Sequence, residues 1–484
     1  MSVRTTATSG VKWSSVSHFG RRGLSLLTNI VLARLLVPAD FGLLGMAAVV
    51  IGFVEVFRDM GTASAIIQRQ NVSDDLLSSI FWVNAVFGCV AMVVLLLISP
   101  VFGLFYRNES VVPILQLLSF SFPLSGLAIL QQALMERRLA FQTLAKIEIF
   151  SAAMAAAVGI TSASLGQGVW SLVYQTLTST TLTTALLWLS THWRPKFVFS
   201  WKETRSVLSF SLNLTAFNVL NYFARNADNF LIGRYLGAQS LGYYDLAYRV
   251  MVYPLQGISA VIGRVMFPLY SQMQGDLKAF RNAYLSIAWA IAFVSFPTML
   301  GLTVVAQGFV LTVFGDKWQP VIELLVILAP LGAIQSIAST VGSIYQARGR
   351  TDWLLRWEIA ASTLIIVAFV VGLNWGVVGV ATAYATVFLL LVYPSFAISF
   401  SLIDLGVHQL GEVLWRPMIC SLMMATVVVM VSHMMTGNGL SGWPALLVQV
   451  AVGVVCYLAF TWMLNRKQMT TLWWVLRGPA EGTA

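Results

Sequence analysis

Two adjacent arginines lie in an apolar segment, where a charged side chain is unusual. Arg21 and Arg22 lie about ten residues into the apolar segment 11–36, hence ~15 Å from its start if the segment is helical. No acidic residue accompanies them there, so they need a partner elsewhere. In a membrane helix such a charge costs about 2.5–3.5 kcal/mol on insertion scales, which marks a functional candidate. A guanidinium stays charged and donates paired hydrogen bonds, and therefore suits an anion such as a diphosphate.

Other apolar segments also carry ionisable residues. They are Glu55, Arg58, Asp59, Arg225, Asp228, Asp245, Arg249 and Arg264. Arg225 and Asp228 are three residues apart, and Asp245 and Arg249 are four apart, so each pair can meet on one helix face.

Two interpretations of these charges stay open. In the first, arginines line a water-filled cationic cavity between helix bundles and bind an anion. Arg21, Arg22, Arg58 and Arg249 are then the main candidate ligands, and Arg225 and Arg264 are secondary ones. In the second, acid–base pairs neutralise one another at packing contacts, while Arg58 and Arg264 extend to a polar boundary. Glu55, Asp228 and Asp245 are candidate sites for a coupling proton or sodium ion.

The segments that must position these residues are membrane helices. Of the 484 residues, 58% are hydrophobic and only 10% are charged, whereas soluble domains carry about 25% charged residues. Because about 20 apolar residues span a bilayer, the sequence predicts an all-α polytopic membrane protein with about fourteen transmembrane helices. The predicted helices span 11–36, 41–59, 78–98, 111–134, 144–164, 168–190, 207–234, 240–269, 281–306, 320–346, 354–373, 376–400, 412–434 and 443–464.

The net charge of +10 is explained by topology and not by nucleic-acid binding. Most of the 29 Lys and Arg fall in loops on the side that holds both termini, and the positive-inside rule then predicts cytoplasmic termini. The first apolar segment lacks a cleavage site typical of a signal peptide and is expected to stay in the protein.

An internal repeat divides the chain. Residues 29–47 align without gaps with 229–247, pairing Arg34 with Arg234 and Gly42 with Gly242, and residues 113–124 align with 320–331. Six predicted helices separate the copies, and this even number predicts two parallel six-helix lobes related by an axis along the membrane normal. We expect an N-terminal lobe at 1–190, a basic cytoplasmic connector at 191–206, a C-terminal lobe at 207–400, and two extra helices with a tail at 401–484.

Signals for an enzyme are weak. Cys89, Cys420 and Cys456 lie in apolar stretches and are expected to be reduced packing residues, and the four histidines show no metal-ligand spacing with them. No Walker A sequence is present, so we expect no cofactor, no metal and no catalysis. Arg34 and Arg234 are expected to be structural, and Trp318 in the loop 314–320 is expected to anchor a turn at the membrane interface.

The sequence resembles the Wzx-type polysaccharide flippases of the multidrug/oligosaccharidyl-lipid/polysaccharide exporter superfamily, closest to the colanic acid exporter branch. The resemblance is carried by SGVKWSS at 9–15, LARLL at 32–36, FGLL at 41–44, RDMGTASAIIQRQ at 58–70, LGYYDLAYRVMVYPL at 241–255, IGRVMFPLYSQMQGD at 262–276 and FGDKW at 314–318.

The resemblance implies a flippase of the bacterial inner membrane. Such a protein moves polyprenyl-diphosphate-linked oligosaccharide units from the cytoplasmic to the periplasmic leaflet by alternating access, for exopolysaccharide or lipopolysaccharide biosynthesis. In related lipid II flippases, arginines on helices 1, 2 and 8 line the cavity, which favours Arg21, Arg22, Arg58 and Arg249 here. Membrane lipids, a polysaccharide polymerase and export machinery are implied partners, and a proton or sodium gradient or the membrane potential is an implied energy source.

Three other functions stay open. A cation-coupled multidrug exporter of the same superfamily is disfavoured by the arginine-weighted segments. A membrane glycan polymerase or glycosyltransferase normally carries longer extramembrane loops with catalytic acids. A scaffold for polysaccharide assembly leaves the intramembrane arginines unexplained.

Overall fold

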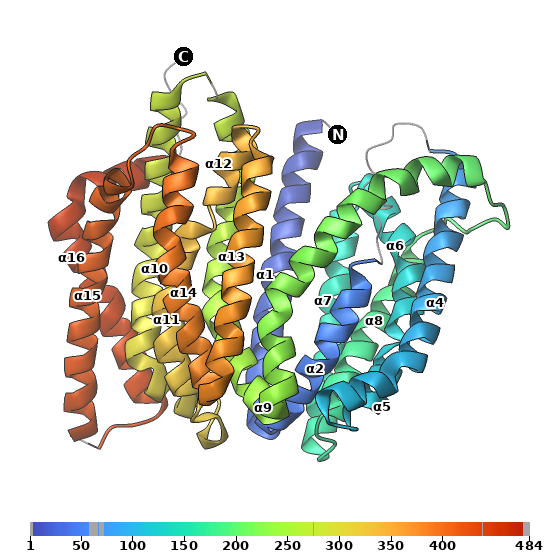
Figure 1. The fold of residues 1–484 in the computed structure, drawn as a ribbon, viewed down its shortest axis with the longest axis horizontal. Coiled ribbons are helices and arrows are strands. Elements are labelled where there is room, and N and C mark those ends of the chain that lie inside the picture. Colours follow the sequence, from blue (N-terminus) through green and yellow to red (C-terminus); the bar gives the residue numbers. More distant parts are fainter. Residues whose placement is uncertain (1–2, 58–65, 67–71, 274, 438, 478–484) are drawn as a thin grey trace. The chain divides into compact units, whose positions relative to one another are not determined.

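The computed structural model describes residues 3–57, 66, 72–273, 275–437 and 439–477. The regular structure of these residues is helical, and no strand occurs among them, as predicted (Figure 1). The chain divides into two compact units, residues 1–242 and 243–484. This division reflects contacts, whereas the predicted lobes reflect the repeat, so the lobe boundaries stay a prediction.

The first unit contains α1 (Val3–Leu35), α2 (Pro38–Glu55), α4 (Asp74–Tyr106), α5 (Val111–Leu118), α6 (Ser121–Arg137), α7 (Phe141–Ser164), α8 (Trp170–Ser190) and the start of α9 (Trp201–Gln272). The second unit contains the rest of α9, α10 (Leu277–Val313), η1 (Asp316–Trp318), α11 (Val321–Ala338), α12 (Val341–Ala347), α13 (Thr351–Gly372), η2 (Leu373–Trp375), α14 (Gly376–Phe400), α15 (Val407–Gly437) and α16 (Trp443–Arg477).

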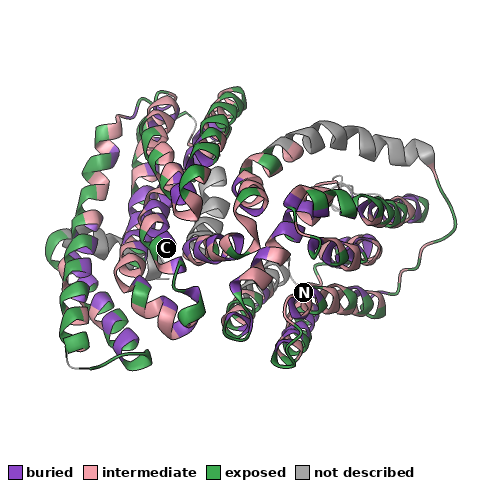
Figure 2. Cartoon of the chain, turned by 60° about the horizontal axis from the view of Figure 1, so that its bottom comes forward, coloured by how far each residue is buried: buried purple, intermediate pink, exposed green. Residues whose placement is uncertain are grey.

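Within the described ranges, nine helical stretches are long and apolar enough to cross a membrane. The longest of them, Thr351–Phe400, joins α13 and α14 and so contains two of the predicted segments. The protein is therefore a multi-pass membrane protein, and the count of about fourteen crossings stays a prediction. Figure 2 shows buried residues where the helices of a unit face one another and exposed residues along their outer sides.

The two repeat copies fold into the same local motif, a helix, a tight turn and a second helix. In the first copy α1 ends at Leu35, and Pro38 starts α2, where the Asp40 carboxylate accepts a hydrogen bond from the Val37 N–H at 3.1 Å. Proline suits this first helical position because its missing N–H has no intrahelical partner there. In the second copy the break falls at Gly237, whose φ of 83° interrupts α9 between the predicted segments 207–234 and 240–269.

Gly42 and Gly242, which the repeat aligns, form a reciprocal contact inside the first unit. A Cβ added to Gly42 would lie 1.6 Å from the carbonyl oxygen of Ala238, and one added to Gly242 would lie 1.9 Å from that of Pro38. Pro38 and Ala238 also hold equivalent repeat positions. Only glycine permits this approach, so α2 and the start of the second α9 segment touch backbone to backbone.

The connector after α8 is bound to α4 by named contacts. The backbone N–H of Lys196 donates to the Ser78 hydroxyl at 3.1 Å, and that of Ser200 donates to the Ser79 hydroxyl at 2.8 Å. The Trp82 indole N–H donates to the Lys196 carbonyl at 2.9 Å. Extended backbone has no ladder partner of its own, and these side chains supply the missing hydrogen bonds.

In the second unit the predicted extra helices pack on α10. α15 contacts α10 and α16, and α16 also contacts α10. Cys420, Met424 and Tyr457 are buried in this core, and the Tyr457 hydroxyl donates to the Phe293 carbonyl at 2.8 Å. Cys89, Cys420 and Cys456 are free thiols; Cys420 is buried, as expected of a packing residue, whereas Cys89 is exposed, so the packing expectation was wrong for Cys89.

Candidate functional site

The partner that Arg21 requires lies on α7. Arg21 Nη1 is 3.7 Å from Oε2 of Glu148, and the Ser17 hydroxyl donates a hydrogen bond to that same oxygen. Ser17 and Arg21 are four residues apart and therefore lie on one face of α1. This face packs against α7, so the sequence-based expectation of a partner outside the segment is confirmed for Arg21.

The backbone allows α1 and α7 to come close beside this pair. A Cβ added to Gly20 would lie 3.3 Å from Cδ1 of Ile149, the residue after Glu148. A methyl group added at position 20 would require the end of the Ile149 side chain to shift by a few tenths of an ångström.

Glu148 is the site residue that the sequence analysis missed. It lies near the start of the predicted segment 144–164, two residues after Lys146, where charged residues are common at a membrane boundary. Its hydrogen bond to Ser17 joins residues 131 positions apart. Local spacing cannot predict such a contact, although the lack of an acid in segment 11–36 signalled that another helix must supply one.

Arg22 lies on α1 next to Arg21 and is less exposed than Arg21. Arg58, the candidate ligand from the second predicted helix, lies outside the described residues, as does Asp59. Glu55 is the last residue of α2 and is exposed. The shared role of Arg21, Arg22 and Arg58 therefore stays a prediction.

One turn before Glu55, α2 packs against α9 within the first unit. The Tyr222 hydroxyl donates to the Val49 carbonyl at 2.6 Å, and a Cβ added to Gly52 would lie 2.5 Å from that hydroxyl oxygen. Phe53 and Phe223 add a ring contact with centroids 5.0 Å apart. The acidic end of α2 is thereby fixed beside α9.

Arg225 and Asp228 also lie on α9. Arg225 is exposed, whereas Asp228 is buried, and its carboxylate accepts the backbone N–H of Asn229 at 2.8 Å. The predicted meeting of the Arg225 and Asp228 side chains stays a prediction.

The second unit holds the predicted i,i+4 ion pair. Arg249 Nε lies 2.7 Å from Oδ2 of Asp245, with side chains 48% and 14% exposed respectively, so this pairing is confirmed. Charge-assisted hydrogen bonds of this length are the strong ones. Arg264 lies in α9, but its side chain is not among those described. That Arg249 shares one cavity with Arg21 stays a prediction.

Arg234 has contacts that fit its expected structural role. Its guanidinium lies over the ring of Phe105 at 5.4 Å and over that of Tyr235 at 5.7 Å. Both contacts lie within the range of cation–π attraction.

The expectation for Trp318 was wrong. The residue is fully buried in η1, with Tyr243 edge-on at a centroid distance of 6.2 Å and Phe314 at 6.4 Å. An interfacial anchor would expose part of its ring to lipid headgroups. Trp318 instead packs the turn between α10 and α11 against the residues around it.

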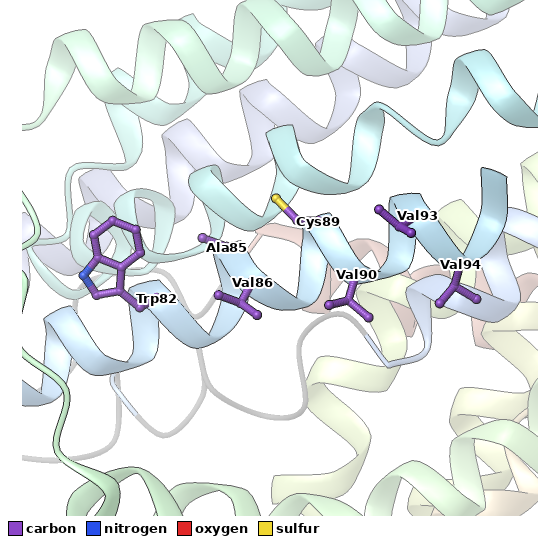
Figure 3. Close-up of a pocket in the computed structure, with 7 residues that line it drawn as sticks. All are labelled: Trp82, Ala85, Val86, Cys89, Val90, Val93 and Val94. Atoms are coloured by element: carbon purple, nitrogen blue, oxygen red, sulfur yellow. The ribbon is translucent and has the colours of Figure 1, made fainter. Parts of the chain in front are cut away.

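An apolar pocket lies along an exposed face of α4 (Figure 3). Its volume is about 390 Å³, and it is lined by Trp82, Ala85, Val86, Cys89, Val90, Val93 and Val94. These side chains offer no charged group to a diphosphate, so the pocket suits a hydrocarbon chain of the bilayer. Among the described residues, no group of three or more His, Cys, Asp or Glu is placed to hold a metal ion.

Comparison with known proteins places the chain in a family. Residues 31–323 match the family described as "Polysaccharide biosynthesis protein". The chain belongs to this family. The match covers more than half of the chain and includes α2, α7 and both repeat copies near Gly42 and Gly242.

Relatives in the family include the lipopolysaccharide biosynthesis protein WzxC of Escherichia coli, which is 32% identical over 80% of this chain and 79% of its own length. The teichuronic acid biosynthesis protein TuaB of Bacillus subtilis is 27% identical over 94% of this chain and 95% of its own. A probable low-salt glycan biosynthesis flippase, Agl15 of Haloferax volcanii, is 23% identical over 84% and 86%. These relatives confirm the resemblance to Wzx-type flippases.

Two solved structures share the fold. The lipid II flippase MurJ in an inward closed conformation superposes with a TM-score of 0.76 at 16% identity, covering 95% of this chain and all of that one. An inward-facing multidrug resistance MATE family transporter of the MOP superfamily gives 0.63 at 14% identity, covering 81% and 96%. At these identities the likeness concerns the fold alone, and it agrees with the predicted superfamily.

Proposed function

We propose that this protein is a flippase that moves polyprenyl-diphosphate-linked oligosaccharides from the cytoplasmic to the periplasmic leaflet of a bacterial inner membrane. Support comes from its family, from relatives named as polysaccharide biosynthesis proteins and a probable flippase, and from a multi-pass fold like that of a lipid II flippase. No covalent bond changes in this reaction, so the protein acts as a transporter.

The observation that carries the proposal is the state of Arg21. Its side chain is 54% exposed within the predicted membrane segment 11–36, and its ion pair with Glu148 is long, at 3.7 Å. A guanidinium held this loosely keeps donors free for a second anion. Arg21 can therefore receive a diphosphate, with the adjacent Arg22 and with Arg58 and Arg249 as further proposed ligands.

The division of the cargo follows from solvation. Moving sugar hydroxyls into hydrocarbon without hydrogen-bond partners is costly. A prenyl chain is itself a hydrocarbon and has no polar group to desolvate, so it stays in the bilayer without this cost. We place the glycan in a hydrated cavity and the diphosphate on the arginines, with the prenyl chain in the bilayer. Alternating access then exposes the cavity to one leaflet at a time, and Glu55, Asp228 and Asp245 are proposed sites for a coupling proton or sodium ion.

A cellular experiment tests this function. Deleting the gene in its host should make the lipid-linked oligosaccharide accumulate and should stop secretion of the corresponding polysaccharide, and wild-type protein should restore both. Arg21→Ala with Arg22→Ala should not restore secretion although it reaches the membrane. The matched control, Lys278→Ala with Lys317→Ala, removes two exposed cations elsewhere and should restore it. Normal secretion by the deletion strain would refute the flippase.

A further inference from the structure

Glu148 forms a defined cluster with Arg21 and Ser17 that the proposed transport mechanism does not yet use. Its side chain is 27% exposed. Its Oε2 atom accepts a hydrogen bond from the Ser17 hydroxyl and forms an ion pair with the Arg21 guanidinium. α8 also packs on α7, but no Asp, Glu, Lys or Arg occurs in its sequence. The nearest other cations in the sequence are Arg22 on α1 and Lys146 on α7.

The ion pair between Arg21 and Glu148 has the geometry of a contact that another anion can replace. One nitrogen of Arg21 approaches one oxygen of Glu148 at 3.7 Å, and the paired hydrogen bonds of a fork-to-fork contact are not made. Arg249 and Asp245 show the contrast, because their 2.7 Å contact involves the inner Nε atom. The half-exposed Arg21 side chain can therefore turn toward a ligand without breaking a strong bond.

We infer that Glu148 is a displaceable counter-ion, occupying Arg21 when no substrate is bound and yielding it to the diphosphate when substrate enters. The inference rests on the proposed function. It assigns to Glu148 a positioning role: the carboxylate and the diphosphate compete for one guanidinium.

The cluster supports both halves of this exchange. Before binding, Glu148 neutralises a cation in the predicted membrane segment 11–36, where an isolated charge would be costly. After displacement, the Ser17 hydroxyl still donates to the carboxylate, so Glu148 is not left without a hydrogen bond. As the diphosphate begins to dissociate, the nearby carboxylate pairs with Arg21 again. Because the carboxylate competes with the diphosphate for this guanidinium, it speeds release of the diphosphate.

Glu148→Gln separates charge from shape, because the amide keeps the size of the side chain and an oxygen that can accept from Ser17. Binding of a sugar-free polyprenyl diphosphate is measured with purified protein in nanodiscs, and transfer of lipid-linked oligosaccharide is measured in liposomes. We expect Glu148→Gln to bind the probe about two- to fivefold more tightly than wild type, the scale of one partly exposed ion pair. It should also lower both KM and kcat, because release slows.

A double-mutant cycle assigns the effect to Arg21. In an Arg21→Ala background, Glu148→Gln should leave probe affinity unchanged, since the competing guanidinium is gone. Glu148→Asp restores the charge on a shorter side chain and should return the affinity toward that of wild type. Glu109→Gln, an exposed carboxylate in the turn after α4, is the matched control and should bind as wild type does.

The outcomes are distinguishable. Unchanged or weaker binding by Glu148→Gln, or tighter binding that persists without Arg21, would overturn the counter-ion role while leaving the flippase in place. A larger change in Glu148→Asp than in Glu148→Gln would show that shape and not charge matters, and would also overturn it. A wild-type protein that neither binds the probe nor transfers lipid-linked oligosaccharide would overturn the proposed function itself.

Discussion

At the scale of residues, the meaning of an arginine in a membrane segment depends on its partner. The pair of Asp245 and Arg249 follows from helix geometry alone, since residues four apart share a face. Arg21 meets Glu148 only because α1 packs on α7, and no spacing in the sequence encodes that contact. The sequence therefore predicted that Arg21 needs a partner, whereas only the structure identifies it.

Arg249→Ala should destabilise the second unit. It removes the cation from Asp245, whose side chain is only 14% exposed, and leaves a carboxylate without its 2.7 Å partner. The expected loss is about 1–3 kcal/mol, the scale for an unsatisfied buried group. The measurement is the apparent Tm in detergent. Asp245→Asn with Arg249→Ala should recover part of the loss, and a wild-type Tm for Arg249→Ala alone would contradict this account.

At the scale of elements, apolar length predicted most helices well because it reflects a bilayer thickness. The break between segments 207–234 and 240–269 was also placed correctly, since Gly237 adopts a positive φ that favours glycine. Trp318 was misplaced because the same residue type serves interfaces and cores, and burial depends on neighbours such as Tyr243 that a local pattern does not reveal.

Gly42→Ala should disrupt the contact between the repeat copies. The new methyl group would fall 1.6 Å from the Ala238 carbonyl oxygen, so α2 and α9 must separate. We expect a destabilisation of more than about 2 kcal/mol, read as a lower apparent Tm. Gly23→Ala on α1 is the matched control, because its Cβ would meet nothing within 4 Å, and alanine favours a helix there. Equal Tm values for the two variants would contradict the contact.

Ser78→Ala with Ser79→Ala should release the connector from α4. The two hydroxyls accept the N–H groups of Lys196 and Ser200, and without them this backbone opens more often. Trypsin should then cut after Lys196 up to about thirtyfold faster, the effect of losing ~1 kcal/mol for each of the two hydrogen bonds. Ser432→Ala, far from the connector in sequence, should leave the cleavage rate unchanged. An unaltered rate in the double variant would show that other contacts hold the segment.

At the scale of the whole molecule, the internal repeat predicts the architecture, and the unequal distribution of Lys and Arg between the two sets of loops predicts the orientation. The equivalent positions of Gly42 and Gly242 meet reciprocally in the structure, which supports the repeat read from the sequence. The superposition on a lipid II flippase covers 95% of the chain and agrees with the predicted superfamily. Topology adds the expected orientation, with both termini in the cytoplasm.

Cysteine labelling tests that orientation. In a variant whose three native cysteines are replaced by alanine, His192→Cys marks the connector and Glu109→Cys marks the turn after α4, and both positions are exposed. An impermeant maleimide added to whole spheroplasts should label position 109 and reach position 192 only after lysis. The opposite pattern would invert the topology and with it the proposed direction of transfer.

The central claim is tested most directly in liposomes that carry a polyprenyl-diphosphate oligosaccharide in one leaflet. Its arrival in the other leaflet is followed for wild-type protein, Arg21→Ala with Arg22→Ala, Lys278→Ala with Lys317→Ala, and empty vesicles. We expect transfer by the wild type and the lysine control, and loss of at least about tenfold in the arginine variant, the equivalent of one charge-assisted hydrogen bond. Wild-type transfer no faster than in empty vesicles, at any imposed ion gradient or potential, would contradict the flippase. Undiminished transfer by the arginine variant would contradict the diphosphate site.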